Sequence, residues 1–182
     1  MSLRSASCLF LLFAFLLGAY QVGTAEAAQV GKVTRVQKQA QIGSKRAVAG
    51  TPVNHNDRVR TGPGARLQIT FVDGTNLTLG ENATVVIDRY VYNPAKGVGE
   101  MALSSTAGAM RFTTGKLSNM KKKNVTVSTP SAALAVRGTE FWMGPIDGHY
   151  GAYVLKGQTD VTSRGRTVRL KPGYGTDIRQ RR

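Results

Sequence analysis

Few side chains of the types that carry catalysis or hold metals occur in this chain. The two histidines, His55 and His149, lie far apart, and neither has a cysteine, a carboxylate or a second histidine at metal-ligand spacing. A serine nucleophile needs a positioned base, and no nucleophile-elbow, Walker or dinucleotide-binding glycine motif is present. The sequence therefore predicts a protein that is not an enzyme and uses no metal or cofactor. A pair of distant carboxylates that converge on a glycoside stays open as an alternative.

The N-terminal segment has the three parts of a secretory signal. Arg4 supplies a positive charge, residues 8–20 form an apolar run, and Ala25 and Ala27 are small residues suited to cleavage. The run is shorter than the ~20 apolar residues that a transmembrane helix needs, so an uncleaved anchor is the less favoured alternative. The only cysteine, Cys8, lies in this run, so the remaining chain has no disulfide or thiol chemistry. We expect a signal peptide at 1–27, a β domain at 28–178, a basic tail at 179–182, and export to the periplasm.

The body of the chain has the pattern of an all-β protein. Residues 66–71 alternate apolar and polar side chains, and Asp73-Gly74 is a hairpin-turn dipeptide before a second alternating run at 76–79. Residues 84–87 are all β-branched and are predicted to be buried on both faces. Glycines and prolines recur about every ten residues, which predicts short antiparallel strands in a compact sandwich, roll or short β-solenoid-like domain.

Two segments are less clear. Thr129 and Pro130 could begin a short helix that Gly138 ends, but an extended crossing fits residues 130–137 equally well. Residues 93–100 are predicted to form a flexible loop.

The charge balance raises the question of an anionic partner. The chain has 25 Lys+Arg against 10 Asp+Glu, a formal net charge of +15. Such a charge suits nucleic-acid phosphates, but an exported domain meets envelope polymers such as cell-wall glycan or lipopolysaccharide instead. The basic residues chosen as candidate contacts are Lys121, Lys122, Lys123, Arg164 and Arg166. Protection of strand edges by charge competes with ligand binding as their role.

Several motifs, in order, resemble the FecR domain. Residues 56–62 (NDRVRTG), 71–79 (FVDGTNLTL) and 129–141 (TPSAALAVRGTEF) resemble the family's lines, and the likeness extends over residues 30–177. Asn56 departs from the family's glycine, and residues 93–105 do not align. The resemblance implies an all-β periplasmic binding or scaffold module that engages another envelope protein in signalling or assembly. The sigma-regulator role of the name-giving members also needs a membrane span and a cytoplasmic segment, which we do not expect here.

The motif residues divide into structural and binding candidates. The structural candidates are Asp57, Asp73, Gly74, Thr129, Pro130, Gly138, Thr139 and Phe141. Arg137 has five donors suited to carbonyls or a carboxylate, and Glu140 is a possible partner. Phe141 and Trp142 would point to opposite faces of a strand, so we expect Phe141 in the core and Trp142 as an exposed recognition residue. The binding candidates are thus Arg137, Trp142 and the five basic residues.

Overall fold

The computed structural model describes residues 28–178, so the predicted signal peptide and the basic tail lie outside the described residues. The described chain forms strands and one short 3-10 turn, η1 (Lys116–Asn119), and no helix in it is long and apolar enough to span a bilayer. The strands are β1 (Gln29–Gln37), β2 (Ala40–Ile42), β3 (Lys45–Arg46), β4 (Pro52–Asn54), β5 (Arg58–Thr61), β6 (Arg66–Phe71), β7 (Asn76–Leu79), β8 (Thr84–Asn93), β9 (Val98–Ala107), β10 (Met110–Thr113), β11 (Lys122–Ser128), β12 (Ala133–Ile146), β13 (His149–Ser163), β14 (Arg166–Leu170) and β15 (Gly175–Ile178).

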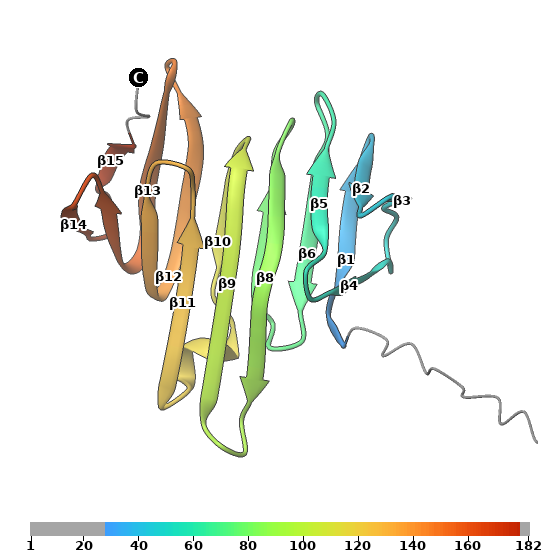
Figure 1. The fold of residues 1–182 in the computed structure, drawn as a ribbon, viewed down its shortest axis with the longest axis horizontal. Helices are drawn as coiled ribbons and strands as arrows, with labels where there is room; N and C mark the ends of the chain where they lie inside the picture. Colours follow the sequence, from blue (N-terminus) through green and yellow to red (C-terminus); the bar gives the residue numbers. More distant parts are fainter. Residues whose placement is uncertain (1–27, 179–182) are drawn as a thin grey trace, which may run out of the picture.

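The sheet forks at the long strand β12. Its first residues, 133–135, pair with β11, and residues 140–143 pair with β10. The whole other edge of β12 pairs with β13, which in turn carries β14 and β15 (Figure 1). One branch continues as β11-β9-β8-β5-β2-β3 and the other as β10-β7-β6-β1-β4. The two branches that leave β12 form two layers, and both layers are joined at the β12–β13 pair.

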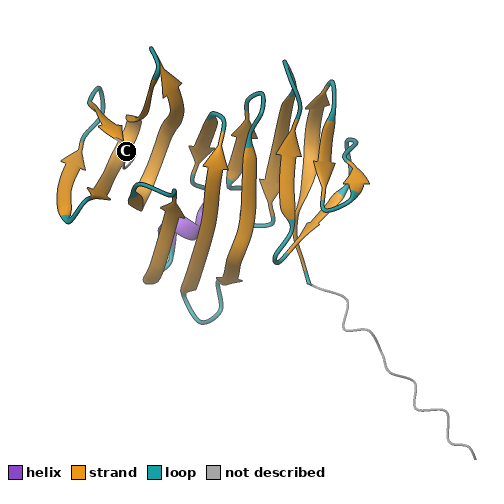
Figure 2. Cartoon of the chain, turned by 45° about the horizontal axis from the view of Figure 1, so that its top comes forward, coloured by secondary structure: helices purple, strands orange, loops and turns teal. Residues whose placement is uncertain are grey.

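The two branches face each other across the core. Phe71 of β6 stacks on Tyr90 of β8 with ring centroids 5.4 Å apart, although these strands belong to different branches. Phe112 and Phe141 stack in the same way near the fork, and the buried apolar residues of both branches form one cluster. Figure 2 shows the strands as these layers, with the 3-10 turn beside β11. Burial of this apolar surface is the main force that holds the layers together.

This architecture confirms the predicted all-β fold, although β12 and β13, with 14 and 15 residues, are longer than the short strands expected. One pair of strands departs from the predicted antiparallel arrangement, because β9 and β11 run parallel. Residues 84–87 were predicted to be buried on both faces, and this was wrong: Val85 and Ile87 are buried, whereas Thr84 and Val86 are half-buried on the other face. β-branched residues suit a half-buried pleated surface equally well, so their presence does not show how many faces are covered.

Each of the two unclear segments contains a turn that joins two strands. Residues 93–100 were predicted to be a loop, but only residues 94–97 form the turn, because Asn93 and residues 98–100 belong to the paired strands of the β8–β9 hairpin. The segment after Thr129 is a tight turn followed by β12, not a helix. The Thr129 hydroxyl accepts hydrogen bonds from the N–H groups of Ser131 (3.3 Å) and Ala132 (2.9 Å), and these bonds close the turn.

Candidate interaction surface

Asp73 is buried at the junction of the two branches. Its carboxylate accepts four hydrogen bonds from described residues: from the Thr75 N–H (3.2 Å) and hydroxyl (2.7 Å), the Tyr90 hydroxyl (2.9 Å) and the Leu117 N–H (3.0 Å). Burial raises the pKa of Tyr90, and the nearby Asp73 carboxylate raises it further, so Tyr90 stays neutral and donates. These contacts tie the β6–β7 hairpin to β8 and to η1. The arrangement supports the structural role predicted for Asp73.

Asp57 closes a second turn. Its carboxylate accepts a hydrogen bond from the Asn54 N–H at 2.7 Å. Between them, Asn56 has φ +63°, a left-handed conformation that glycine and then asparagine adopt most readily. Asparagine can therefore replace the glycine of the FecR pattern here without a change in backbone conformation.

The motif at the start of β12 is held mainly by contacts within the fold. Gly138 has φ +61°, in a bulge of the β12–β13 ladder. The buried Thr139 donates its hydroxyl hydrogen bond to the Gln158 carbonyl at 2.6 Å, and Phe141 is fully buried. Pro130 is exposed in the turn before β12.

Arg137 is exposed and lies over β13 instead of pairing with Glu140. Its guanidinium is 3.6 Å from the Asp160 carboxylate, which Arg169 of β14 also contacts with two hydrogen bonds of 2.7 and 3.1 Å. The Arg169 hydrogen bond lowers the pKa of the Asp160 carboxyl, and Arg137 adds to that effect. Glu140 pairs instead with Arg111, whose Nε donates at 2.8 Å. The bulge at 137–140 separates Arg137 from Glu140 along β12 and explains why the suggested pair does not form.

The outer face of β12 and β13 carries an apolar patch. We define the apolar patch as Trp142, Ile146, Tyr153 and Leu155, which with Arg111 line a shallow groove of about 450 Å³. Trp142 lies directly opposite Tyr153 across the β12–β13 pair and opposite Arg111 across the β10–β12 pair. Ile146, Tyr153 and Leu155 are 45%, 40% and 41% exposed, whereas Trp142 is half-buried beside them and not exposed as the sequence predicted. Large side chains at this exposure, side by side, form a contiguous apolar surface.

The sequence predicted Trp142 but not the other three members of the patch. Tyr153 and Leu155 flank the buried Val154, so period-2 alternation about Val154 places both on the outer face. This alternation is the sequence pattern from which the outward orientation of Tyr153 and Leu155 could have been predicted.

The structure separates the two basic groups. Lys121, Lys122 and Lys123 are exposed at the beginning of β11, and the Lys123 ammonium donates to the Ser118 carbonyl at 2.6 Å. Arg164 and Arg166 lie at the β13–β14 turn, near the other end of β11, because the Ser163 hydroxyl donates to the Ser131 carbonyl. Seven residues of β11 span about 20 Å at ~3.3 Å each. The candidate basic residues therefore do not form one site.

No arrangement suited to metal binding occurs among residues 28–178, where no group of three or more His, Asp or Glu side chains converges. His55 lies half-buried in the turn before β5, and His149 begins β13 with its Nδ1 3.1 Å from the Asp147 carbonyl oxygen.

Comparison with known proteins assigns the class. The model of the family described as FecR protein matches residues 57–160, more than half of the chain. The protein is therefore a member of the FecR family, as the sequence motifs predicted.

Solved structures share the fold. Two crystal structures of a protein from Parabacteroides distasonis, described as an anti-sigma factor and determined at 1.65 and 2.50 Å, each match with a TM-score of 0.50. They are 21% and 20% identical in sequence, and each match covers 65% of this chain and 52% of the other. This chain thus aligns with about half the length of that protein, and identity at this level shows the fold alone. A search of the curated proteins found no match.

Proposed function

We propose that this protein is a non-catalytic FecR module of the periplasm that binds another envelope protein through the apolar patch, in signalling or assembly. The observation that carries the proposal is the exposure of Ile146, Tyr153 and Leu155 together on one sheet face, with the half-buried Trp142 beside them. A contiguous exposed apolar surface on a highly charged protein is typical of an interaction site.

The composition of the patch supports a protein partner. Tryptophan, tyrosine and arginine are enriched among the residues that dominate protein–protein binding energies. Arg111 lies at the edge of the groove and is held by Glu140, so its guanidinium is oriented before a partner arrives. A rigid sheet face with an oriented arginine loses little conformational entropy on binding.

Two further observations support the setting. The predicted N-terminal signal favours export, and the anti-sigma description of the P. distasonis protein favours a role in signalling. A binding module fits both, because signal relay requires one protein surface to recognise another.

Site-specific photo-crosslinking in cells tests the proposal. A photoreactive amino acid at Tyr153 should give a discrete adduct with one protein, because this side chain is at the centre of the patch. The matched control places the same amino acid at Val48, which is 54% exposed. Val48 precedes β4, the last strand of the branch that begins with β10. Five strand spacings of ~4.8 Å separate β4 from β12, so position 48 should not give the adduct. Equal adducts at both positions, or none at Tyr153, would contradict the proposal.

A second candidate function rests on the exposed lysines at 121–123. Three consecutive exposed lysines beside the β8–β9 turn suit an anionic envelope polymer. Lys122 lies beside that turn because its N–H donates to the Gly97 carbonyl. Sedimentation with purified lipopolysaccharide should then fall steeply with salt and on replacement of all three lysines by glutamine. Neutralising the exposed Lys45, Arg46 and Arg60 instead is the charge-matched control. Equal losses in both variants would indicate attraction by net charge alone.

A further inference from the structure

A second concave site lies on the other side of the sheet from the apolar patch. It has a volume of about 250 Å³ and lies where the β9–β10 turn, the β11–β12 turn and the ends of β12, β13 and β15 meet. Pro145 lines this pocket, whereas its neighbour Ile146 belongs to the apolar patch, and adjacent strand residues point to opposite faces. The pocket is therefore separate from the surface proposed above.

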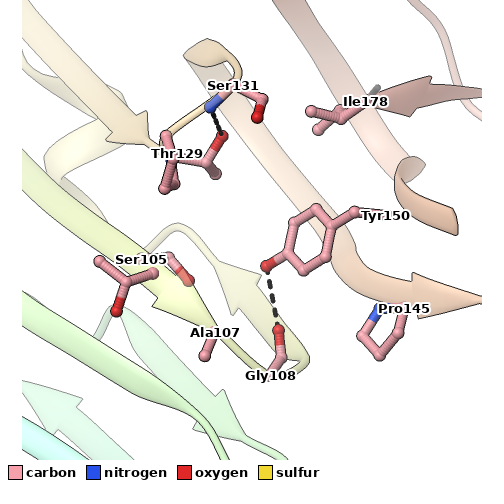
Figure 3. A pocket seen from close by; sticks show the side chains of 10 residues that line it. Ser105, Ala107, Gly108, Thr129, Ser131, Pro145, Tyr150 and Ile178 are labelled. Carbon is pink, nitrogen blue, oxygen red and sulfur yellow. Dashed lines mark hydrogen bonds between the residues drawn. The ribbon is translucent and has the colours of Figure 1, made fainter. Parts of the chain in front are cut away.

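Tyr150 forms the centre of the pocket. Figure 3 shows its ring between Pro145 and Ile178, with the hydroxyl directed to the β9–β10 turn. The hydroxyl donates to the Gly108 carbonyl at 2.9 Å. Burial raises the pKa of Tyr150, so the phenol is neutral at ordinary pH, and its oxygen keeps a lone pair for a further hydrogen bond.

The wall opposite Tyr150 is closely packed. Gly108 has φ +77°, and a Cβ at this position would lie 2.3 Å from Cα of Ala83. Any larger residue would collide with backbone, so Gly108 fixes how closely the turn approaches β8. This wall of the pocket is therefore held against the start of β8 by backbone packing.

One buried hydroxyl of the pocket has no partner. Ser105 is 2% exposed, and its Oγ makes no hydrogen bond of acceptable geometry within the described chain, although it lies near the Tyr150 hydroxyl. Buried polar groups are nearly always paired, and an unpaired one at a pocket indicates a missing ligand or water. Ser105, Thr106, Ser131 and Tyr150 bring hydroxyl groups to the lining, whereas the Thr129 hydroxyl is taken up by the turn before β12. None of the lining side chains is charged.

We propose that this pocket binds one uncharged sugar residue. Hydroxyls both donate and accept, so they complement the alternating donors and acceptors of a sugar ring. Pro145, Ile178 and the Tyr150 ring offer apolar contact for its C–H face. The volume lies just below the ~300 Å³ at which drug-sized sites begin, which suits a single ring.

Titration of the purified protein with methyl glucoside and with N-acetylglucosamine, followed by amide NMR, tests the proposal. At least one neutral sugar should give saturable shifts at Gly108, Ser131 and Tyr150. Loss of one hydrogen bond typically weakens binding by roughly threefold to tenfold, so Tyr150→Phe and Ser105→Ala should each have an effect of that size. Glucuronate and inorganic phosphate are the charged probes and should bind more weakly.

Thr159 provides a matched control, because it is the second buried hydroxyl without a partner and does not line the pocket. Ser105→Ala and Thr159→Val each remove an unpaired hydroxyl, so neither should lower the melting temperature. Only Ser105→Ala should weaken sugar binding. Three results would overturn the proposal: no saturable shift with any neutral sugar, tighter binding of the charged probes, or equal sugar affinity in Ser105→Ala and the wild type.

Discussion

Replacing Asp73 by asparagine tests the structural account most sharply, because the change keeps the shape of the side chain and alters only its chemistry. In the wild type, each carboxylate oxygen accepts two hydrogen bonds, Oδ1 from the Thr75 N–H and Tyr90 and Oδ2 from the Thr75 hydroxyl and the Leu117 N–H. An asparagine must direct its NH2 group at one of these two pairs of donors. The Thr75 and Tyr90 hydroxyls can rotate, but the backbone N–H groups of Thr75 and Leu117 cannot.

The cost follows from these contacts. At least one buried N–H is left unpaired, which costs about 1–3 kcal/mol of stability. The hydrogen bonds that remain are also weaker, because their acceptor is no longer charged. Removing a buried charge recovers part of its desolvation penalty. We therefore expect the free energy of unfolding to fall by about 2–4 kcal/mol, which corresponds to a melting temperature about 4–16 °C lower for a domain of this size.

Urea denaturation followed by circular dichroism measures the change. Asp88→Asn is the matched control, because Asp88 is exposed and its carboxylate contacts only the Ser104 hydroxyl among the described residues; it should change the unfolding free energy by less than about 1 kcal/mol. A double-mutant cycle of Asp73→Asn with Tyr90→Phe should give a coupling of about 0.5–3 kcal/mol. Equal stability of the Asp73 and Asp88 variants would refute the role assigned to Asp73.

Two further predictions concern stability. Burial raises the pKa values of Tyr90 and Tyr150; since unfolded tyrosines lose their protons near pH 10, the unfolding free energy should be constant up to about pH 9 and fall above pH 10. Urea midpoints between pH 8 and 11.5 check this, and Tyr90→Phe should flatten the alkaline fall, so an identical slope in that variant would argue against the assignment. Gly157→Ala should cost more than 2 kcal/mol, because its Cβ would lie 2.4 Å from the Gly138 carbonyl oxygen. Gly165→Ala, with a similar positive φ but open space around it, should cost only the ~1–2 kcal/mol of the left-handed backbone, and equal melting temperatures would show that the close approach has no energetic weight.

The strands were predictable where apolar and polar residues alternate strongly. β9 lacks such alternation and was not predicted. Residues 66–79 alternate cleanly and form the expected β6–β7 hairpin. β9 (VGEMALSSTA) contains glycine, glutamate and alanine, which are depleted in strands. It is extended because β8 and β11 pair with its two edges, and a parallel partner such as β11 leaves no turn signal in the sequence.

The candidate residues show a similar division. The opposite orientations of Phe141 and Trp142 followed from strand geometry, and the structure places Phe141 in the core and Trp142 on the outer face. The partners of Asp73 could not be inferred, because Tyr90 and Leu117 are 17 and 44 residues away. Arg137 likewise meets Asp160 through the β12–β13 ladder, and the bulge that sets this register has no sequence signature of its own.

The affinity of the crosslinked protein for patch variants tests the central claim most directly. Once the adduct at position 153 identifies the partner, the dissociation constants of the purified pair should be compared for the wild type, Trp142→Ala and the control Val48→Ala. A buried aromatic anchor contributes about 2 kcal/mol or more, so Trp142→Ala should weaken binding by about 30-fold or more, with a folded protein confirmed by circular dichroism. Val48→Ala should bind as the wild type does. Equal affinity of the Trp142 variant and the wild type would contradict the claim that this protein recognises its partner through the apolar patch.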